Sequence, residues 1–311
     1  MPESTDSNNY KLTVVIPMYN EEAGAAECVR RVDKIVSEMG CQYELIFVND
    51  GSRDKTLDVL IGAKQNNPHV RIIDLSRNFG HQLAIRAGIE HSTGDALIVI
   101  DGDLQDPPEL FPELVKKWRH EGFDIVHARR KTRQGISAFA DARAKLFYQI
   151  LSSISSVDIP RDVGDFRLIS KPVIETLKTM REQQPYVRGQ AAWVGYPSTI
   201  IEYDREKRFA GEPQYTLVKL LHLCFSGIFG FSRMPLRLGI YLGLILFAVG
   251  ILFVILLIIY KNRIIGWAPS VIATVFVGSL QFFAIGIIGE YLAIVLDHSR
   301  GRPLYVVKRE Y

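Results

Sequence analysis

Short apolar runs and amphipathic helical patterns alternate through the first half of the chain. Each run is short enough for a buried strand and is bounded by turn residues. The runs are residues 12–16, 43–48, 70–75, 96–100 and 123–127, and helical patterns at 22–39, 54–65, 81–91 and 109–120 separate them. Strands that alternate with helices in this way predict an α/β fold with a mostly parallel sheet and right-handed crossovers.

Polar stretches follow the first four predicted strands at their carboxyl ends. They are residues 17–21, 49–52, 76–80 and 101–106. One such stretch is typical of an ordinary turn. Four of them along one edge predict a site of nucleotide size, because ligands of open α/β sheets bind outside the carboxyl ends of the strands.

Two of these polar residues, Asp101 and Asp103, come directly after the buried run 96–100. In extended backbone, residues two apart project to the same side, so both carboxylates can face one ligand. Such a pair attracts a hard divalent cation, Mg²⁺ or Mn²⁺, and Gln105 adds a carbonyl oxygen. The alternative is a capped loop before the helix that begins near Pro108.

The C-terminal part has a different pattern, with two long apolar stretches at 238–260 and 267–296. The first has 23 residues, a length of about 35 Å as a helix, which is enough to cross a hydrocarbon core of about 30 Å. The pattern predicts a hairpin of two transmembrane helices, and a hairpin of buried soluble helices is the alternative. The residues just before it, 217–231, are apolar with few charges and predict an interfacial helix.

Positive charges flank this predicted hairpin unequally. Those outside it outnumber Lys261 and Arg263 in its turn; they are Arg233, Arg237, Arg300, Arg302, Lys308 and Arg309. The positive-inside rule therefore predicts that both ends are cytoplasmic. The expected organisation is a mobile tail (1–10), a cytosolic catalytic domain (11–213), an interfacial amphipathic helix (214–235), two transmembrane helices (236–299) and a cytoplasmic tail (300–311), in a multi-pass protein of the inner (plasma) membrane.

Composition and charge narrow the functional classes. A net charge of +3 does not indicate a nucleic-acid partner. Cys28, Cys41 and Cys224 lack the spacing of a zinc site or a disulfide framework. The glycine-rich loops of dinucleotide-binding and P-loop proteins are also missing from the sequence.

Four stretches together resemble the sugar-nucleotide motifs of the family 2 glycosyltransferases, which have the GT-A fold. They are PMYNEE (17–22), VNDGSRDKT (48–56), SRNFG (76–80) and DGDLQDPPE (101–109). The resemblance implies a nucleotide-sugar donor whose base, ribose and diphosphate are held from one edge of the sheet. It assigns donor binding to Pro17, Tyr19, Glu21, Asp50, Asn78 and Asp101, and metal binding to Asp101, Asp103 and Gln105.

Residues 163–168 (VGDFRL) resemble the family motif that carries an acceptor-side aspartate. The resemblance makes Asp165 the candidate catalytic base, beside Asp103 as the second catalytic residue. A structural ion pair with Arg167 is the alternative. A phosphate acceptor with a second pKa of about 6 is already mostly anionic at neutral pH. We therefore expect Asp165 mainly to orient Arg167 or to take a residual proton below neutrality.

Basic residues near the predicted site are candidates for binding an acceptor phosphate. They are Arg129 at the end of the fifth strand, and Arg205, Lys207 and Arg208 in the loop before the apolar region. That loop has Pro213 and Gln214 where the family often has Ser or Thr and Lys, which leaves its donor contact open. Residues 289–292 and 301–305 resemble the polyprenyl-phosphate branch of the family, which includes dolichol-phosphate mannose synthase and bacterial undecaprenyl-phosphate glucosyltransferases.

We therefore expect an inverting, metal-dependent transfer of a hexose, with UDP-glucose as the first candidate donor, to undecaprenyl phosphate at the cytoplasmic membrane face. A processive polysaccharide synthase is one alternative, although the Gln-x-x-Arg-Trp motif of that class is missing. A non-catalytic scaffold that binds sugar nucleotides beside a flippase is another. Small residues in the second apolar stretch permit close helix approach and favour a homo-oligomer, with a tetramer as the first arrangement to test. They are Gly278, Ala284, Gly286 and Gly289. Glu290, an acid within that stretch, is a candidate for a functional or subunit contact.

Overall fold

The computed structural model describes residues 9–131, 163–180, 182, 185–204, 241–246, 248–252, 255 and 268–311. The chain divides into two compact units. Unit 1 comprises residues 1–152, 157–216 and 303–311, and unit 2 comprises residues 153–156 and 217–302. The predicted N-terminal tail (except its last two residues), the interfacial helix and the basic loop with Arg205, Lys207 and Arg208 lie outside the described residues.

Unit 1 is built on an eight-stranded sheet with the order β7-β5-β6-β4-β1-β2-β3-β8. Strands β6 and β8 are antiparallel to their neighbours, and the other pairs are parallel. The strands are β1 (Lys11–Met18), β2 (Gln42–Asn49), β3 (Val70–Leu75), β4 (Ala96–Val99), β5 (Ile125–Arg130), β6 (Val163–Ser170), β7 (Ser198–Tyr203) and β8 (Val307–Glu310). The predicted mostly parallel sheet is confirmed.

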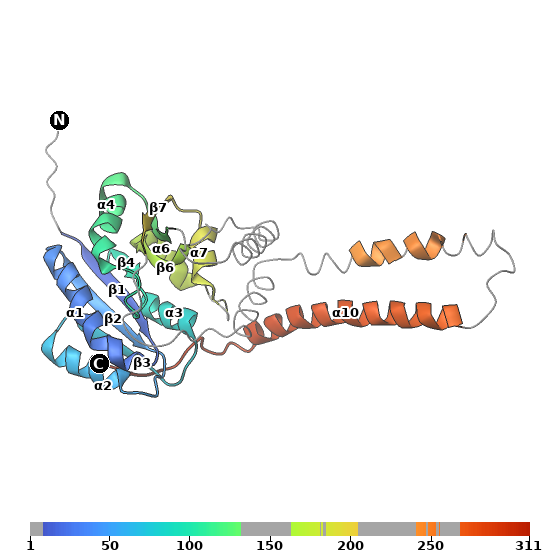
Figure 1. Ribbon diagram of the computed structural model, residues 1–311, viewed down its shortest axis with the longest axis horizontal. Helices are drawn as coiled ribbons and strands as arrows, with labels where there is room; N and C mark the ends of the chain where they lie inside the picture. The colour runs from blue at the N-terminus through green and yellow to red at the C-terminus, as the bar shows by residue number, and fades with distance from the viewer. Residues whose placement is uncertain are drawn as a thin grey trace. The chain divides into compact units, whose positions relative to one another are not determined.

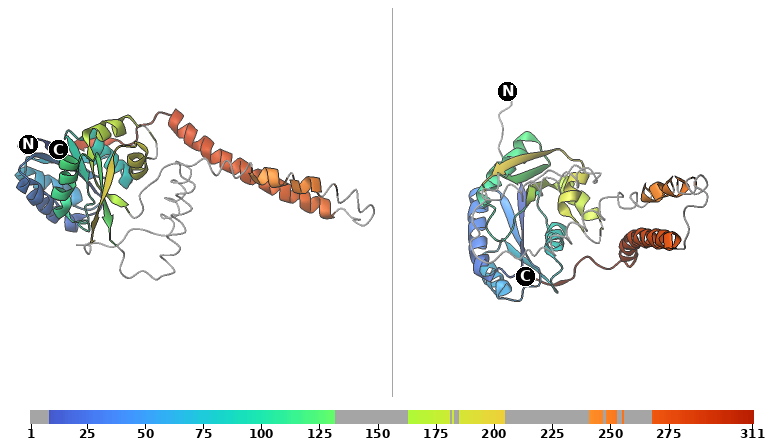
Figure 2. Two further views of the ribbon diagram at one scale, coloured as in Figure 1. Left: turned by 90° about the horizontal axis from the view of Figure 1, so that it is seen from above. Right: turned by 45° about the vertical axis from the view of Figure 1, so that its right-hand side comes forward.

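Helices cover both faces of this sheet (Figures 1 and 2). One core contains residues of α1 (Glu22–Glu38), α2 (Thr56–Asn66) and α4 (Phe111–Glu121), which follows the short 3₁₀ helix η1 (Pro108–Leu110). The other contains residues of α3 (His81–His91), α6 (Lys171–Thr179) and α7 (Val187–Trp193). The central strands are apolar on both faces because each face packs against a helical layer. This is the α/β class expected from the sequence.

Strand β6 lies between β4 and β5, although it follows both in sequence. It pairs antiparallel with β4, with Val99 opposite Arg167. If this register continued two residues further, it would bring Asp101 opposite Asp165. The insertion of β6 therefore determines which acidic residues meet at the edge of the sheet.

The last residues of the chain, 303–311, belong to unit 1 and include a strand that the sequence did not predict. Strand β8 pairs antiparallel with β3 and is the last strand of the sheet. Beyond it, Tyr311 and Ile72 exchange two backbone hydrogen bonds of 3.0 and 3.1 Å. The sequence did not reveal this strand because three of its four residues, 307–310 (VKRE), are charged and show no apolar pattern. The strand forms through backbone hydrogen bonds to β3, a partner that is distant in the sequence.

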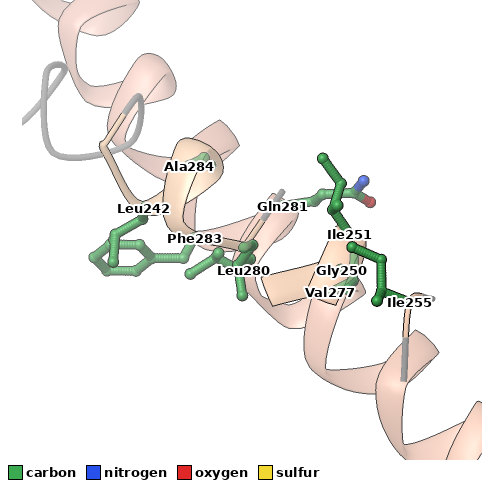
Figure 3. A pocket seen from close by; sticks show the side chains of 11 residues that line it. Leu242, Gly250, Ile251, Ile255, Val277, Leu280, Gln281, Phe283 and Ala284 are labelled. Atoms are coloured by element: carbon green, nitrogen blue, oxygen red, sulfur yellow. The ribbon is translucent and has the colours of Figure 1, made fainter. Parts of the chain in front are cut away.

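Unit 2 contains the long helix α10 (Ala268–Ser299). Within the described residues, Ala273–Ser299 is the one helix long and apolar enough to cross a membrane, and a shorter apolar helix covers Tyr241–Leu252. These helices line a pocket of about 720 Å³ whose walls include Leu242, Ile251, Phe283 and Gln281 (Figure 3). Large apolar side chains such as Phe282 and Leu292 are exposed, at 78% and 65%. By length and composition, the described part thus contains one helix suited to cross a membrane, and the predicted two-helix hairpin is shown only in part.

Candidate active site

The carboxyl ends of β1, β2, β3 and β4 form one edge of the sheet, and the loop after β4 carries the predicted carboxylate pair. The residue between the two acids is Gly102. A Cβ at this position would lie 2.4 Å from the sulfur of Met18, so a glycine fits here without displacing Met18. Leu104 is buried and has a φ of 57°, which is uncommon for a residue other than glycine. Such backbone conformations persist where the surrounding structure holds them and cluster at functional sites.

Asp101 directly follows the last residues of the buried β4 run. Among the described residues its Oδ1 has no hydrogen-bond partner and lies 3.5 Å from the Nε2 of His81. Burial raises the pKa of Asp101 to about 6 against the opposing charge of His81, and the neighbouring carboxylates Asp165, Asp106 and Asp103 raise it further. A carboxylate oxygen that accepts no hydrogen bond is suited to bind a divalent cation, since Mg²⁺ and Ca²⁺ take oxygen ligands.

The rest of the loop after β4 is shaped by its own hydrogen bonds. Asp103 Oδ1 accepts the backbone N–H of Gln105 at 3.1 Å, which forms a tight turn around the predicted metal ligands. Asp106 is fully buried, accepts a 2.5 Å hydrogen bond from the hydroxyl of Tyr203 and lies 3.3 Å from Arg130. Asp106 therefore anchors the loop to β5 and β7, a role that the sequence pattern did not reveal.

Asp50, at the end of β2, organises the loop that follows β3. Its two carboxylate oxygens accept the backbone N–H groups of Phe79 and Gly80 at 2.7 and 2.9 Å. The side-chain amide of Asn78 donates to the same carboxylate at 3.0 Å. Gly51 has a φ of +63°, and a Cβ there would lie 2.4 Å from the backbone of Arg77. The loop after β2 and the loop after β3 are thus fastened together.

The remaining predicted donor-binding residues lie at the end of β1 and just beyond it. Pro17 is buried within the strand, while Tyr19 and Glu21 are partly exposed. The backbone N–H of Glu21 donates to the hydroxyl of Thr56 at 2.9 Å, and its carbonyl accepts the N–H groups of Gly24 and Ala25 in the first turn of α1. The three residues therefore share the edge that carries Asp50 and Asp101. Their donor-binding roles stay predictions.

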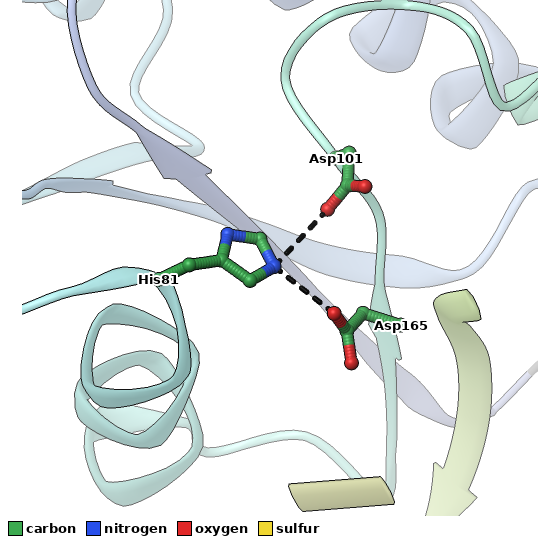
Figure 4. A group of neighbouring side chains, drawn as sticks. All are labelled: His81, Asp101 and Asp165. Atoms are coloured by element: carbon green, nitrogen blue, oxygen red, sulfur yellow. Dashed lines mark hydrogen bonds and ion pairs between the residues drawn. The ribbon is translucent and has the colours of Figure 1, made fainter. Parts of the chain in front are cut away.

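Asp165, near the start of β6, is 3% exposed, and Figure 4 shows it beside His81 and Asp101. His81 Nε2 lies 3.1 Å from its Oδ2, and Gln82 donates to the same oxygen at 3.2 Å. Arg188 approaches both oxygens, with Nε and Nη2 each at 2.8 Å. Although burial raises the pKa of Asp165, Arg188 and His81 lower it to well below the ordinary value. A pKa lowered in this way weighs against the expected uptake of a residual proton below neutrality.

Two arginines contact Asp165, and they differ in exposure. Arg167 is 1% exposed and donates to the carbonyls of Gly164 and Asp165, at 2.9 and 3.3 Å. Its Nη2 lies 3.4 Å from Asp165 Oδ1, so the ion pair considered from the sequence is present. The closer, two-point pair is made by Arg188, whose side chain is 32% exposed. The sequence did not single out Arg188, because 23 residues separate it from Asp165.

The predicted phosphate-binding arginine, Arg129, lies at the carboxyl end of β5. Its Nε donates to Glu202 of β7 at 3.1 Å, so a carboxylate neutralises it in this structure. The neighbouring Arg130 projects to the opposite face and contacts Asp106. Phosphate binding by Arg129 stays a prediction, and so does binding by Arg205, Lys207 and Arg208 beyond the described residues.

The residues present fit a divalent cation in one of two arrangements. His81, Asp101 and Asp165 offer ligand atoms within 4.8 Å of one another. Both oxygens of Asp165, however, are taken by Arg188, His81 and Gln82, and the arginine would repel a cation there. The Oδ1 of Asp101 accepts no hydrogen bond from the described residues, although His81 lies 3.5 Å from it, and Asp103 two residues on offers a second hard anionic ligand. We therefore favour Asp101 and Asp103 as the ligand pair.

In open α/β sheets, ligands such as nucleotides bind outside the carboxyl ends of the strands, where this chain places its two carboxylates. Residues 13–178 match the model of glycosyl transferase family 2, and the chain belongs to this family. The resemblance to the family 2 glycosyltransferases found in the sequence is thereby confirmed.

Relatives match over nearly the whole chain. An uncharacterized glycosyltransferase, YkcC of Bacillus subtilis, is 40% identical over 98% of this chain and 95% of its own. The bactoprenol glucosyl transferase of Shigella phage SfV is 34% identical over 96% of this chain and 99% of its own. Among solved structures, glucosyl-3-phosphoglycerate synthase from Mycobacterium tuberculosis with Mn²⁺, UDP and phosphoglyceric acid gives a TM-score of 0.49 at 17% identity, covering 71% of this chain and 76% of that one.

Proposed function

We propose that this glycosyltransferase moves a hexose, with glucose from UDP-glucose as the first candidate, to a polyprenyl phosphate such as undecaprenyl phosphate. The observation that carries the proposal is Asp101, whose buried Oδ1 accepts no hydrogen bond from the described residues and lies 3.5 Å from His81, between the nucleotide-side loops and the basic cluster around Asp165. The full-length similarity to a bactoprenol glucosyl transferase supports the lipid acceptor.

The roles of the residues follow from the charges that the reaction develops. In an inverting transfer, an acceptor oxygen attacks the anomeric carbon while the bond to the nucleoside diphosphate breaks. A divalent cation, Mg²⁺ or Mn²⁺, held by Asp101 and Asp103 with Gln105 nearby, would neutralise the departing diphosphate. Asp50 and Asn78 fix the loop after β3, which together with Pro17, Tyr19 and Glu21 forms the proposed nucleotide-binding surface.

A phosphate acceptor changes what catalysis must accomplish. With a second pKa of about 6, by analogy with phosphorylated side chains, the attacking oxygen is already largely anionic at pH 7. Two anions must nevertheless come within reacting distance. Fixed cationic groups that face them lower this repulsion most effectively in a site that excludes water. The positive side chains around Asp165 are therefore more important to the proposal than a general base.

The connection of the two units supports a membrane hairpin. The segments that flank unit 2, residues 157–216 and 303–311, both belong to unit 1. One folded unit lies on one side of a membrane, so the chain between these segments crosses an even number of times. If α10 crosses, a second crossing is needed, and we assign it to residues 238–260. Cysteine labelling of an Asn262→Cys variant without native cysteines should then occur only from the outer side.

We further propose that the spans mediate a homo-oligomer, with a tetramer as the first arrangement to test. Gly278, Gly286 and Gly289 of α10 leave room for close helix approach. Mass measurement of the protein in native-like lipid tests this directly, and a monomer would contradict it.

The function itself is tested by transfer of radiolabel from nucleotide sugars into organic-extractable lipid. Purified full-length protein in lipid nanodiscs with undecaprenyl phosphate is offered a panel of UDP- and GDP-hexoses. We expect UDP-glucose to give labelled lipid in the presence of Mg²⁺ or Mn²⁺, and Asp103→Asn to give none. Binding of nucleotide sugar without labelled lipid from any donor would favour the non-catalytic scaffold. Growth of a long labelled polymer would favour the processive synthase.

A further inference from the structure

Arg188 of α7 is held in one orientation from two sides. Its Nε and Nη2 form a two-point ion pair with Asp165, each at 2.8 Å. The preceding residue, Val187, donates its backbone N–H to Gln82 Oε1 at 3.0 Å, and Gln82 Nε2 donates to Asp165 at 3.2 Å. The start of α3 therefore fixes both the carboxylate and the beginning of the helix that carries Arg188.

The geometry leaves one edge of the guanidinium available. Asp165 takes the edge formed by Nε and Nη2, while Nη1 donates to no acceptor in the described part of the chain. The second edge of an arginine presents two parallel N–H donors and matches two oxygens of a phosphate group. The side chain is 32% exposed, so a ligand has access to it.

Arg167, in contrast, is not accessible to bind a phosphate group. Its side chain is 1% exposed. Its guanidinium donates to backbone carbonyls of Gly164, Asp165 and Val187, at 2.9, 3.3 and 3.5 Å. These bonds tie β6 to the start of α7. Arg167 thus supports the framework on which Arg188 is presented.

The order of the strands separates Arg188 from the nucleotide side. The loops that carry Tyr19, Asp50 and Asn78 follow β1, β2 and β3, which all lie on one side of β4. Asp165 belongs to β6, on the other side of β4, and Asp101 follows β4 itself. A donor that extends from β2 towards the carboxylates would present its sugar towards β6, so an anion bound at Arg188 faces the sugar rather than the nucleoside.

We propose that Arg188 binds the phosphate group of the acceptor and that Asp165 is a positioning residue that acts through Arg188. This inference rests on the proposed function, since it assigns the acceptor phosphate of that reaction. Binding of the acceptor phosphate depends on both residues. Arg188 supplies the two-point contact, and the buried carboxylate of Asp165 holds the guanidinium in one orientation before the acceptor binds.

The test compares Arg188→Ala, Arg188→Lys, Asp165→Asn and the double variant Arg188→Ala/Asp165→Asn in full-length protein in nanodiscs. Arg30→Ala is the matched control, because Arg30 is exposed and pairs with Glu27 on α1. Kinetics are measured against undecaprenyl phosphate and against nucleotide sugar separately. Calorimetry with farnesyl phosphate, and with inorganic phosphate, in the presence of UDP and Mn²⁺ measures acceptor-type binding without turnover.

We expect Arg188→Ala to raise the KM for undecaprenyl phosphate about 10- to 100-fold, the range for a lost charge-assisted hydrogen-bond pair. The KM for nucleotide sugar should change less than about threefold, and Arg188→Lys should recover part of the loss. Asp165→Asn should raise the same KM, and the double variant should be no worse than Arg188→Ala, since a residue that acts through another adds nothing once its partner is gone. Retained UDP binding shows that each variant is folded.

Several outcomes would overturn the inference. These are a rise in the nucleotide-sugar KM instead, multiplied losses in the double variant, or farnesyl phosphate binding that is absent in the wild type or unchanged in Arg188→Ala. Inorganic phosphate binding as tightly as farnesyl phosphate would assign the site to a free phosphate rather than a lipid headgroup. Wild-type protein that binds farnesyl phosphate through Arg188 but transfers no sugar would instead refute the proposed function alone.

Discussion

The two sides of the site each contain a buried aspartate, and the two are held in opposite ways. Asp50 is 2% exposed and accepts hydrogen bonds from backbone N–H groups and the amide of Asn78. Asp165 is 3% exposed and contacts the ionisable side chains of Arg188, His81 and Arg167. Burial raises the pKa of Asp50, whereas the cations around Asp165 outweigh burial and lower its pKa well below the ordinary value.

This contrast separates two uses of a buried carboxylate. Neutral donors around Asp50 fix the shape of a loop, so the carboxylate defines a surface on which a nucleotide can rest. Charged donors around Asp165 fix the direction of other charges. A carboxylate that is ionised throughout the physiological range and already paired is a weak proton acceptor, so Asp165 is better suited to positioning than to general-base catalysis.

The largest effect should come from the carboxylate pair between the two regions. We expect Asp103→Asn to lower the transfer rate about 1,000-fold or more, since loss of a bound cation removes several kcal/mol of charge stabilisation. EDTA should do the same to the wild type. Added Mn²⁺ should restore the wild type after EDTA but not the variant. Full wild-type turnover in EDTA would remove the metal from the mechanism.

Asp165→Asn should cost about 10- to 100-fold in kcat/KM, as expected for weakened charge-assisted hydrogen bonds. Because the pKa of Asp165 is held well below its ordinary value, the carboxylate stays ionised between pH 6 and 8. The deficit should therefore be constant over this range, as measured by kcat/KM at each pH. A deficit that grows towards pH 6 would show that the residue takes up a proton.

Asp50→Asn should have a smaller effect, confined to the donor. The amide nitrogen cannot accept one of the two backbone N–H groups that Asp50 now binds. We expect the KM for nucleotide sugar to rise about tenfold and the KM for undecaprenyl phosphate to stay unchanged. Equal rises in both would mean that the two regions are not independent.

The smallest effect on activity should come from Glu44, a buried carboxylate near the start of β2, at the opposite end of the strand from Asp50. Although burial raises its pKa, hydrogen bonds from Thr13, Thr93 and Arg71 lower it to about 2. Its contribution to stability is therefore present above its unfolded pKa and is lost as the pH falls through about 2. Glu44→Gln should lower the free energy of unfolding at pH 7 by about 3 kcal/mol.

That loss should appear as a lower melting temperature, with little change in transfer rate below it. The gap between variant and wild type should narrow as the pH falls towards 2. An activity loss as large as that of Asp165→Asn, in protein that remains folded, would show that the two ends of the sheet are coupled.

Local patterns in the sequence were sufficient for much of this protein. Buried runs such as 96–100 and the helical patterns between them predicted the sheet, because burial on both faces favours apolar residues along most of a strand. The same patterns placed Asp101 and Asp103 directly after β4. Boundaries were less accurate: β5 begins at Ile125, two residues after the predicted start, where the carbonyl of Pro197 accepts the N–H groups of Asp124 and Ile125.

What the sequence determined by itself is therefore the class of fold, the apolar C-terminal region and the acids at the edge of the sheet, since each depends on residues close together in the chain. Only the tertiary structure decided which charges meet. His81 and Asp165 are 84 positions apart, and Arg188 reaches the pair from a third element. It also decided that β8 completes the sheet beside β3. Such contacts join residues that are far apart in the chain and depend on which strands and helices are neighbours in the fold. The local periodicity of the sequence does not specify this order.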